Sequence, residues 1–536
     1  MFNTLIELVS GPFLVTFLIG ISSTLLFYWY ATRNHDYWKK RGIPYVKPVP
    51  LFGSVLENTK RPLYQIFTER YYKLGPIYGF FEANKPLLSI GDPALLKNIL
   101  VKDFPAFSSR RSLVTGDKVF DSMVSTLRGE DWKRVRSIIT PTFTTGKLKR
   151  MLGIFKECSE TLMKIFENTV KQGKPIDAKR LYGTLTMDVI ASAAFSTKID
   201  SHNDPDNEFV KTARDTFSGN RSYKFLILLL LPFLPKSLKR MLFSRGSNNF
   251  FRDTTFQIIE NRKRTGQVRN DFLQLLMDTA KEVSDEEKWE ENDKGDIASN
   301  YEEQNEGQQM FKTTSNKKLS MDELIAQCVI FFLAGYETTA STLSFATYML
   351  ALNQDIQDKL RAEVDQTLAE NNGELTYEVI KNMKYLDNVI SETLRLFPPA
   401  IRLERVADAD YKLGYMGITI PKGMAINIPM YCMHRDPKYY PSPEIFDPDR
   451  FTTEERAKRN PYTYLPFGAG PRNCIGMRFA LMEIKICLSH VIAKFKIKKS
   501  PLTKDKLEFN LGQAGLLQPK EIIVDMEIRE DTPLMK

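Results

Sequence analysis

The stretch that decides the fold lies near the C-terminal end of the chain and reads Pro466-Phe467-Gly468-Ala469-Gly470-Pro471-Arg472-Asn473-Cys474-Ile475-Gly476. A helical run over residues 477–494 follows it directly. Two glycines and a proline before a single cysteine predict a tight loop. The backbone N–H groups and the dipole of the next helix then favour the thiolate form of that cysteine. Such a sulfur can bind a metal axially, although an isolated cysteine is more often a buried, inert core residue.

The spacing of the fixed positions separates these two interpretations. The pattern Phe467-Gly-x-Gly-x-Arg472-x-Cys474-x-Gly476 closely resembles the haem-thiolate loop of the cytochrome P-450 monooxygenases. That resemblance implies that Cys474 is the proximal ligand of haem iron and that Phe467 packs beside its sulfur. It also implies that Gly476 lets the next helix approach the porphyrin and that Arg472 pairs with a haem propionate. A thiolate ligand pushes electron density onto iron and favours O–O cleavage, so the ligand already indicates oxygen activation.

The composition predicts a globular chain with reduced thiols. Of the 536 residues, 43% are hydrophobic and 11% aromatic, enough for a sizeable core in one large catalytic unit or in several domains. The five cysteines are scattered and form no C-x-x-C pair, which indicates a body that faces the cytosol. The net charge is +10, and residues 284–306 hold ten acidic residues against two lysines, so the remainder carries +18. That excess suits an acidic partner or anionic lipid, but lysines spread over a solvated surface explain it equally well.

Residues 1–31 predict a membrane anchor. Only Glu7 is charged between residues 5 and 31, and residues 12–30 supply about 20 apolar or small residues, the length that spans a bilayer. A cleaved signal peptide is the alternative, but its positive start, short apolar centre and small-residue cleavage site are absent. Basic residues follow the span, which places the body on the cytoplasmic side. Residues 32–50, with Pro44, Pro48 and Pro50, predict a stiff, extended linker.

The next part of the chain carries a hairpin signal, a helix start and a tryptophan–arginine pair. Short apolar runs at 77–81 and 87–90 flank Asn84-Lys85-Pro86 and predict a hairpin, and Asp92 before Pro93 predicts a capped helix start. Trp132 and Arg136 are four residues apart and share a face of a helix. A surface cation beside an aromatic ring would explain that pair without a function. The P-450 resemblance instead assigns both residues to haem propionates, with Arg110 as a third contact.

Two segments of unusual composition follow. Residues 225–235 form an apolar run that is too short to span a membrane and contains two prolines. It is either a buried core segment or a loop that enters the membrane beside a lipid-facing substrate entrance. Residues 284–309 are polar and acidic, which predicts a solvated, disordered loop.

A long helical run begins at Met321 and contains Ala334-Gly335-Tyr336-Glu337-Thr338-Thr339. Gly335 is costly in a helix interior and Thr338 can bond a carbonyl one turn back, so the helix is able to loosen here. A threonine-rich helix with an incidental glycine is the alternative. The stretch resembles the oxygen-binding groove of the P-450 family. By that resemblance Ala334 and Gly335 leave room for oxygen, while Glu337 and Thr338 manage protons.

The segment from 391 to 451 contains scaffold candidates. Glu392 and Arg395 are three residues apart on a helical stretch, a spacing often seen in surface ion pairs. The resemblance joins them to Arg450 in a structural network beneath the haem and makes Arg405 a further propionate partner. It also implies a substrate cavity lined by Phe331, Ala400, Ile401 and Leu516.

The resemblance covers the chain from the anchor to Leu517. Arg402-Leu403-Glu404-Arg405 and Met477-Arg478-Phe479-Ala480 look most like the animal detoxification branch, which holds the vertebrate 3A-type and insect xenobiotic-metabolising enzymes. It implies a mostly helical P-450 fold with a smaller β-rich portion over residues 51–536, preceded by one transmembrane helix.

The expected function is a single-pass enzyme of the endoplasmic reticulum that inserts one oxygen atom from O₂ into lipophilic substrates. These are xenobiotics, with steroids or fatty acids as further candidates. The chain has no flavin or dinucleotide fingerprint. The resemblance therefore implies electrons from NADPH through NADPH–cytochrome P-450 reductase, with cytochrome b5 as another candidate partner and no nucleic acid. A haem-thiolate isomerase or dehydratase and a non-catalytic haem carrier remain alternatives, and the pair Glu337-Thr338 disfavours the first of these.

Overall fold

The computed structural model describes residues 2–111, 116–195, 197–204, 206–212, 235, 238, 246–269, 271–279, 318–510 and 515–532, with side chains placed from residue 14 onward except at 246–249. The apolar run at 225–234 and the acidic loop at 284–309 lie outside these residues, so both interpretations of them stay predictions. Within the described chain helices dominate and the strands form small sheets, as the sequence predicts.

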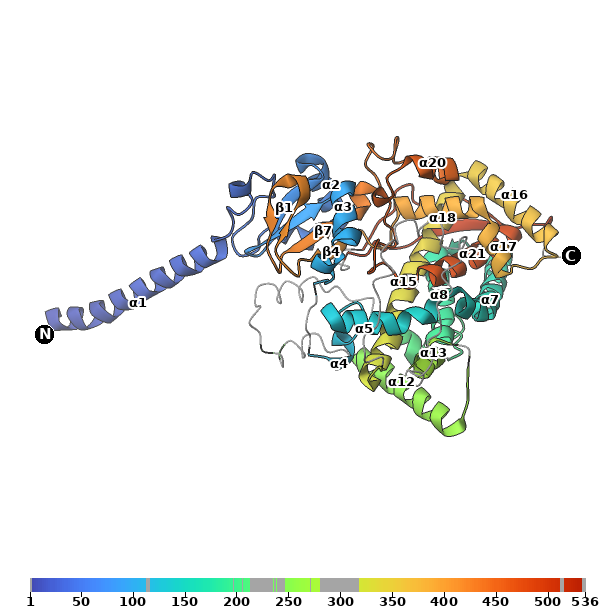
Figure 1. Ribbon diagram of the computed structural model, residues 1–536, viewed down its shortest axis with the longest axis horizontal. Helices are drawn as coiled ribbons and strands as arrows, with labels where there is room; N and C mark the ends of the chain where they lie inside the picture. Colours follow the sequence, from blue (N-terminus) through green and yellow to red (C-terminus); the bar gives the residue numbers. More distant parts are fainter. Residues whose placement is uncertain are drawn as a thin grey trace.

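A four-stranded sheet forms the part of the body nearest the N-terminal helix (Figure 1). The predicted hairpin is confirmed, because β1 and β2 pair antiparallel with Ile77 opposite Ile90. β7 pairs parallel with β2 and antiparallel with β4, so the sheet joins the N-terminal hairpin to strands from the C-terminal half. In spatial order the sheet contains β1 (Ile77–Glu82), β2 (Lys85–Ile90), β7 (Ala425–Ile428) and β4 (Leu403–Val406). Two smaller sheets contain β3 (Ile176–Asp177), β9 (Ile523–Ile528) and β8 (Phe495–Lys498), and β5 (Tyr411–Lys412) with β6 (Thr419–Ile420).

Helices make up most of the remaining body. The longer ones are α2 (Leu63–Leu74), α5 (Gly129–Ile139), α7 (Leu152–Lys171), α8 (Ala178–Phe195), α12 (Gly246–Thr265), α13 (Phe272–Thr279), α15 (Met321–Leu352), α16 (Gln354–Glu370), α18 (Lys384–Leu396) and α21 (Met477–Lys494). The shorter ones are α3 (Pro93–Lys97), α4 (Lys118–Asp121), α6 (Thr145–Arg150), α17 (Tyr377–Asn382), α19 (Met430–Met433) and α20 (Thr453–Lys458). Single helical turns are η1 (Lys39–Arg41), η2 (Leu56–Thr59), η3 (Asn98–Lys102), η4 (Phe104–Phe107), η5 (Thr140–Phe143), η7 (Gly414–Met416), η8 (Pro448–Phe451) and η9 (Pro461–Thr463).

Local signals set several of these helix ends. The Asp92 side chain accepts a hydrogen bond from the Leu95 N–H at 3.0 Å, which confirms the predicted cap of α3. α15 starts at the predicted Met321 with a capping box formed by Ser320 and Glu323. α21 covers the predicted residues 477–494 and starts directly after the cysteine loop.

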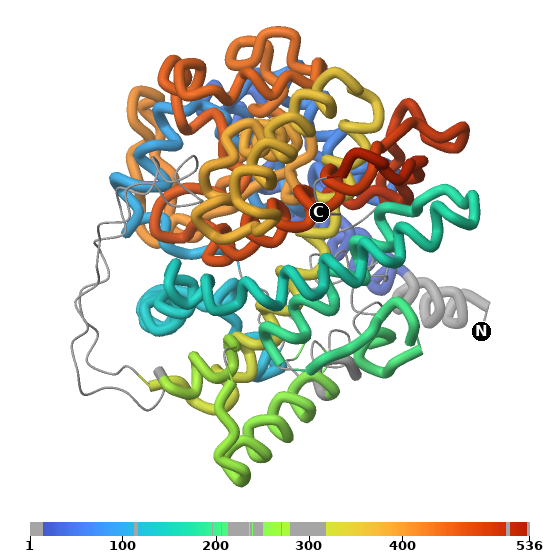
Figure 2. The backbone as a smooth tube through the Cα atoms, turned by 90° about the vertical axis from the view of Figure 1, so that its right-hand side faces the viewer, coloured from blue at the N-terminus to red at the C-terminus, as the bar shows by residue number. Residues whose placement is uncertain are grey.

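α15 is the central helix of the body. Figure 2 shows it in yellow, between the orange and red C-terminal segments and α12 in green. It is apolar and long enough to cross a membrane, but 67% of its most apolar window is buried inside the protein, so it is a core helix. The predicted loosening at Gly335 to Thr338 is not seen, because α15 runs unbroken through these residues. Gly335 lies where α8 approaches, and a Cβ there would stand 3.0 Å from Ile190.

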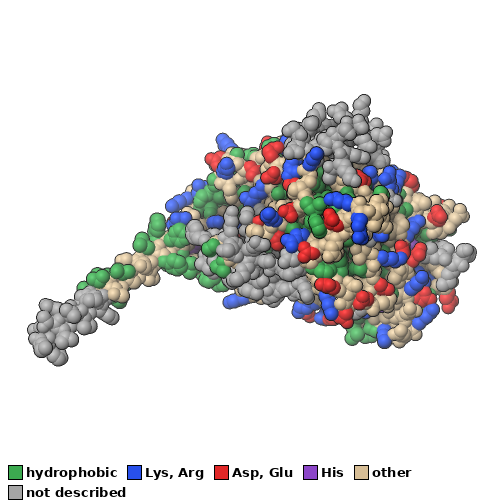
Figure 3. All heavy atoms as spheres, turned by 90° about the horizontal axis from the view of Figure 1, so that it is seen from below, with side chains coloured by type: hydrophobic (Ala, Val, Ile, Leu, Met, Phe, Trp, Pro, Cys, Tyr) green, Lys and Arg blue, Asp and Glu red, His purple; other side chains and the backbone are tan. Residues whose placement is uncertain are grey.

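The N-terminal helix α1 (Phe2–Thr32) extends away from the body (Figure 1). Its residues Leu14–Thr32 meet the length and apolarity of a membrane span, and only 6% of that window is buried. Figure 3 shows apolar side chains along this helix. On the face of the body that it displays, Lys and Arg alternate with Asp and Glu and do not gather into one basic patch.

The segment 32–50, predicted to be a stiff, extended linker, is packed against the sheet. Trp38 is 1% exposed and lies over Gly79 of β1, where a Cβ would come within 2.3 Å of the indole. Tyr45 pairs with Gly79 as a parallel bridge. At the helix exit, two hydrogen bonds join this segment to the hairpin turn: Asn34 Nδ2 donates to the Asn84 carbonyl at 3.0 Å, and Asn84 Nδ2 donates to the Tyr30 carbonyl at 3.2 Å. The prolines stiffen this segment, but apolar packing of Trp38 holds it to the body.

Candidate active site

The cysteine loop is held by its own backbone. The Cys474 N–H donates to the Phe467 carbonyl at 2.8 Å, and the Gly468 N–H donates to the Leu465 carbonyl at 2.9 Å. Gly470 has φ +71°, and a Cβ there would lie 1.9 Å from the Leu100 carbonyl oxygen. Only glycine fits this position, because both the dihedral angle and the close approach exclude a side chain. A Cβ at Gly476 would instead make ordinary contact with Phe143 at 3.9 Å.

Cys474 differs from the other cysteines in its accessibility. All five are described and free, and Cys474 is the exposed one. Cys432 is buried, with its Sγ 3.9 Å from Thr68 Oγ1, and burial raises its pKa to about 12.

The surroundings of Cys474 act on its pKa in both directions. Although the Cys474 side chain is accessible, the protein atoms packed around it desolvate the thiolate and raise the pKa of the thiol, while the Gly476 N–H and the charges of Arg136 and Arg110 act in the opposite direction. The loop by itself therefore does not favour the thiolate as the helix dipole suggested, because desolvation is the larger effect. A metal ion would remove the thiol proton.

Four arginines predicted as anion contacts come together beside this cysteine. Arg110 Nη2 donates to the Arg472 carbonyl at 2.9 Å, and Arg136 Nη2 donates to Asn473 Oδ1 at 2.9 Å. Arg472 donates to the carbonyls of Ser108 and Leu127, the latter at 2.6 Å. Burial and then repulsion from Arg110 lower the pKa of Arg405 to about 9, and burial with its three arginine neighbours lowers the pKa of Arg472 to about 8. The cluster thus concentrates positive charge in a buried place.

This positive charge is incompletely matched by the described residues. Arg405 is 0% exposed, yet its Nε and Nη2 have no hydrogen-bond partner in the described chain, and neither has Nε of Arg472. Buried polar atoms are rarely left unsatisfied, and guanidinium groups pair best with carboxylates. The cluster is therefore suited to an acidic group supplied by a ligand.

α15 presents a small accessible face inside the body. Ala334 is exposed although its helix is largely buried, and the Thr338 Oγ1 donates to the Ala334 carbonyl at 2.7 Å. Glu337 points elsewhere: it is buried and forms an ion pair with Lys179 of α8, and Ser341 Oγ donates to it at 3.0 Å. Gly335 faces Ile190 of α8, so helix packing also favours a glycine here, and the role of Ala334 and Gly335 in making room for oxygen stays a prediction.

Comparison with known proteins decides what this site is. The sequence model of the family described as Cytochrome P450 matches residues 43–526. The chain belongs to the cytochrome P450 family. Relatives include Cytochrome P450 3A5 of Homo sapiens, 39% identical over 534 residues that cover 98% of this chain and 99% of the relative. Cytochrome P450 3A11 of Mus musculus is 38% identical over 524 residues, 97% of each chain, and Cytochrome P450 3A14 of Cavia porcellus is 38% identical over 534 residues, 98% of this chain and 99% of the relative.

As a cytochrome P450, the chain is a monooxygenase that uses haem with a cysteine thiolate ligand. The residues present fit haem, which carries an iron and two carboxylates. An accessible cysteine in a rigid loop matches the iron, and unpaired guanidinium atoms of Arg405 and Arg472 match the carboxylates. Trp132 is 2% exposed and its ring lies under the Arg472 guanidinium at 4.7 Å, so the structure places it where it orients that arginine.

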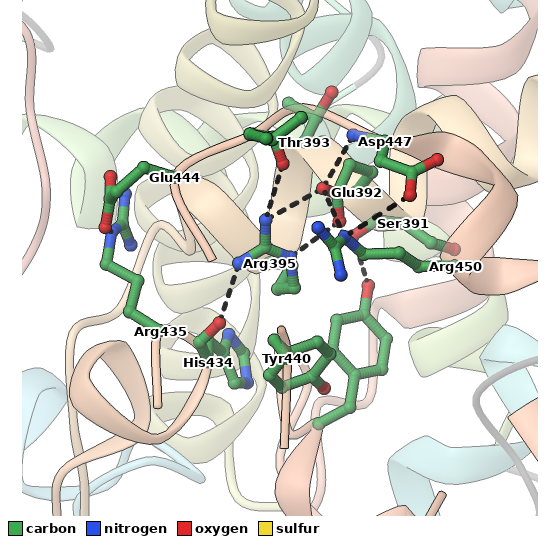
Figure 4. A network of polar contacts seen from close by, with 12 residues as sticks. Ser391, Glu392, Thr393, Arg395, His434, Arg435, Tyr440, Glu444, Asp447 and Arg450 are labelled. Carbon is green, nitrogen blue, oxygen red and sulfur yellow. Dashed lines mark hydrogen bonds and ion pairs between the residues drawn. The ribbon is translucent and has the colours of Figure 1, made fainter. Parts of the chain in front are cut away.

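The expected scaffold network of this P450 is assembled at the C-terminal end of α18 (Figure 4). Arg395 donates to both carboxylate oxygens of Glu392, at 2.6 and 2.8 Å, and both side chains are fully buried. Arg450 of η8 lies 3.6 Å from Glu392, and the Asp447 N–H donates to the same carboxylate at 2.9 Å. Sequence reasoning named all three charged residues, and the structure brings them together.

The four residues expected at the substrate cavity of the P450 fall into two places. Ala400 and Leu516 form an antiparallel bridge, and the Ile401 N–H donates to the Gly515 carbonyl at 2.9 Å. Ile401 and Leu516 line a narrow recess of about 10 Å³, which is too small to hold a lipophilic substrate, together with Pro62, Leu63, Tyr64, Phe509, Asn510 and Leu517. Phe331 does not line that recess: it is 6% exposed and packs against Phe143 and Phe272 at ring distances of 5.1 and 5.4 Å, so its place at a substrate cavity stays a prediction.

Sequence reasoning missed three residues that shape this site. Lys179 pairs with Glu337 from 158 positions away, and no local pattern indicates it. Asn473, which accepts from Arg136, lies next to Cys474 inside the loop pattern and could have been found there. His434 belongs to no motif named from the sequence, yet its Nε2 accepts from the Leu465 N–H just before the cysteine loop.

Proposed function

We propose that this P450 inserts one oxygen atom from O₂ into lipophilic small molecules, chiefly xenobiotics. The observation that carries the proposal is the accessible Cys474 beside buried, unpaired guanidinium atoms of Arg405 and Arg472. The resemblance to 3A-type relatives over nearly the whole chain supports the substrate class.

Cys474 is the proposed axial ligand, and Arg110, Arg136, Arg405 and Arg472 are proposed to hold the haem carboxylates. When bound, haem supplies the iron at which O₂ is activated, and its thiolate ligand favours O–O cleavage. Asn473 fixes Arg136 toward the loop through the 2.9 Å bond to its Nη2. The residues of the chain thus supply the ligand sulfur, neutralise the carboxylates and fix the orientation of the group.

Proton delivery is proposed to use Thr338 and Glu337. Thr338 Oγ1 lies on the accessible face of α15 and can hold a proton at that atom after releasing the Ala334 carbonyl. The Glu337 carboxylate is joined to Lys179, whose side chain is 18% exposed, so protons can reach Glu337 from the surface side of α8. This arrangement favours a monooxygenase over a haem-thiolate isomerase, since an isomerase has no such protons to deliver.

The enzyme is proposed to lie on the endoplasmic reticulum membrane with α1 as a single span and the body in the cytoplasm. The exposed apolar face of Leu14–Thr32 and the basic residues after it support this placement. Electrons are proposed to come from NADPH through NADPH–cytochrome P450 reductase, with cytochrome b5 as a further candidate.

The test is turnover of a panel of lipophilic compounds by the full-length enzyme in vesicles with reductase and NADPH. Product should require the reductase, and product without it would indicate an isomerase or dehydratase. Thr338→Ala should keep haem and the substrate-induced spectral change but release hydrogen peroxide in place of product, whereas Thr338→Ser should stay coupled. An Ala variant with wild-type product per NADPH would contradict the role of Thr338. Cys474→His should lose the red-shifted band of the reduced, CO-bound enzyme, and an unchanged band would remove Cys474 as ligand.

A further inference from the structure

His434 lies between the scaffold network and the cysteine loop. It follows α19 directly and is 0% exposed. Its backbone carbonyl accepts a hydrogen bond from Arg395 Nη1 at 2.8 Å, as Figure 4 shows. Its imidazole Nε2 accepts from the Leu465 N–H at 2.9 Å. One residue therefore binds the Glu392–Arg395 pair with its main chain and the segment before the loop with its side chain.

Leu465 marks the point where the cysteine loop begins. It is 1% exposed, so its N–H has no access to water and needs a protein acceptor. Its carbonyl accepts the Gly468 N–H at 2.9 Å, and Phe467 in the same turn accepts the Cys474 N–H at 2.8 Å. The bond from His434 is thus the first of a short series of hydrogen bonds that ends at the cysteine.

The imidazole ring is fixed in position and in protonation state. Its ring packs on Tyr464 at 5.3 Å, and the Tyr464 hydroxyl donates to the Ser391 carbonyl at 2.8 Å. Burial, and then the charges of Arg395 and Arg435, lower the pKa of His434 to about 3. The ring therefore stays neutral at physiological pH, and Nε2 is free to accept.

We propose that His434 is a positioning residue for the haem ligand. Its Nε2 holds the Leu465 amide and so fixes the start of the Cys474 loop relative to the Glu392–Arg395 pair. The scaffold network stabilises the thiolate loop through this contact, although it has no described bond to the loop residues 466–474. The inference rests on the proposed assignment of Cys474 as ligand.

Two substitutions of His434 separate the effect of its hydrogen-bond acceptor from the effect of its side-chain volume. His434→Gln places an amide oxygen near the position of Nε2 and keeps the acceptor, whereas His434→Leu leaves the Leu465 N–H buried and unpaired. The holoenzymes are compared by the fraction of red-shifted thiolate band in the reduced, CO-bound spectrum and by hydrogen exchange of the peptide containing Leu465. The Leu variant should lose a large part of the thiolate band and exchange the Leu465 amide about tenfold faster, the effect of one net hydrogen bond. The Gln variant should stay close to wild type in both.

His490→Leu is the matched control, since its ring bonds only the Ile486 carbonyl of its own helix α21 among the described contacts. It should change neither measurement. A Leu variant with wild-type spectrum and exchange overturns the proposal, and so does a Gln variant that behaves like Leu. If His434→Leu yields no holoenzyme, the Gln variant decides: a wild-type spectrum supports the proposal and failure to fold overturns it.

Failure of the ligand assignment gives a different result. Cys474→His would then keep the thiolate band, whereas the exchange of the Leu465 amide in the His434 variants is measured without reference to the haem spectrum. The two proposals can therefore fail separately.

Discussion

Two fully buried arginines of this P450, Arg395 and Arg405, have opposite surroundings. Arg395 donates to both oxygens of Glu392 and to the His434 carbonyl, so its charge and its donors are matched within the chain. Arg405 donates only to its neighbour's carbonyl, that of Glu404 at 3.0 Å, and two of its nitrogens have no partner among the described residues. Burial alone therefore does not tell a scaffold residue from a ligand site. The two kinds of residue are distinguished by how far the buried charge is paired with groups of its own chain.

Breaking the buried ion pair of Glu392 and Arg395 should give the largest loss of stability. Glu392→Gln leaves Arg395 as an uncompensated buried charge, and removal of one partner of such a pair costs about 3–5 kcal/mol. Chemical denaturation of the holoenzyme measures this loss. Asp449→Asn, which opens the exposed pair with Lys359, is the control and should change stability by less than about 0.5 kcal/mol. A Glu392→Gln variant as stable as this control would contradict the interpretation that the charge of Arg395 is balanced within the chain.

Removing Arg405 should leave the stability of the haem-depleted protein unchanged or raise it, in contrast to the loss expected for Glu392→Gln. Arg405→Met takes one cation out of the crowded cluster, so the apoprotein should be as stable as wild type or more stable. Haem should dissociate at least about tenfold faster, since a charge-assisted hydrogen bond contributes about 1.5–3 kcal/mol. Haem transfer to a scavenger protein and thermal unfolding of the apoprotein measure the two effects. Arg402→Met on the same segment is the control, and apoprotein destabilised by Arg405→Met would place Arg405 with the scaffold.

Acid should destabilise the scaffold network of Glu392 and Arg395 through its neighbour His434. Its pKa is about 3 in the folded protein against 6.5 for an ordinary histidine. Below pH 6.5 His434 therefore binds a proton in the unfolded chain but stays neutral in the folded protein. The free energy of unfolding falls by up to about 1.4 kcal/mol per pH unit as the pH drops toward 3. The difference in unfolding midpoint between wild type and His434→Gln should shrink or reverse from pH 8 to pH 5. If the unfolding midpoints of wild type and His434→Gln changed in parallel with pH, this would contradict a neutral, buried imidazole.

The smallest effect on stability should come from the partly exposed pair of Lys179 and Glu337. Lys179→Met leaves the buried Glu337 carboxylate with its bond from Ser341 but without its cation, so the loss should be about 1 kcal/mol, the lower end of the cost of an unsatisfied buried group. The proposed proton route predicts a lower ratio of product to NADPH consumed in this variant. Lys171→Met, which opens an exposed pair with Glu167 on α7, is the control. A wild-type ratio would show that Lys179 has only a structural role.

The parts that could be predicted from the sequence depend on neighbouring residues. The limits of α21, the start of α15 and the hairpin of β1 and β2 follow from caps, periodicity and turn residues. The pair of Glu392 and Arg395 follows from its spacing of three on a helix.

The parts that could not be predicted depend on distant packing. The α8 side chain Ile190 packs at Gly335, the rings of Phe143 and Phe272 pack on Phe331, and Trp38 docks the proline-containing linker on β1. No pattern within one segment specifies which other segment will pack against it.

Two hydrogen bonds, from Asn34 to the Asn84 carbonyl and from Asn84 to the Tyr30 carbonyl, join the end of α1 to the tip of the first hairpin. A helix whose apolar length differs from the thickness of the bilayer adjusts by tilting. If α1 spans the bilayer as proposed, these two bonds would pass such a tilt to the tip of the first hairpin. Bilayer thickness would then affect the angle between the four-stranded sheet and the lipid surface.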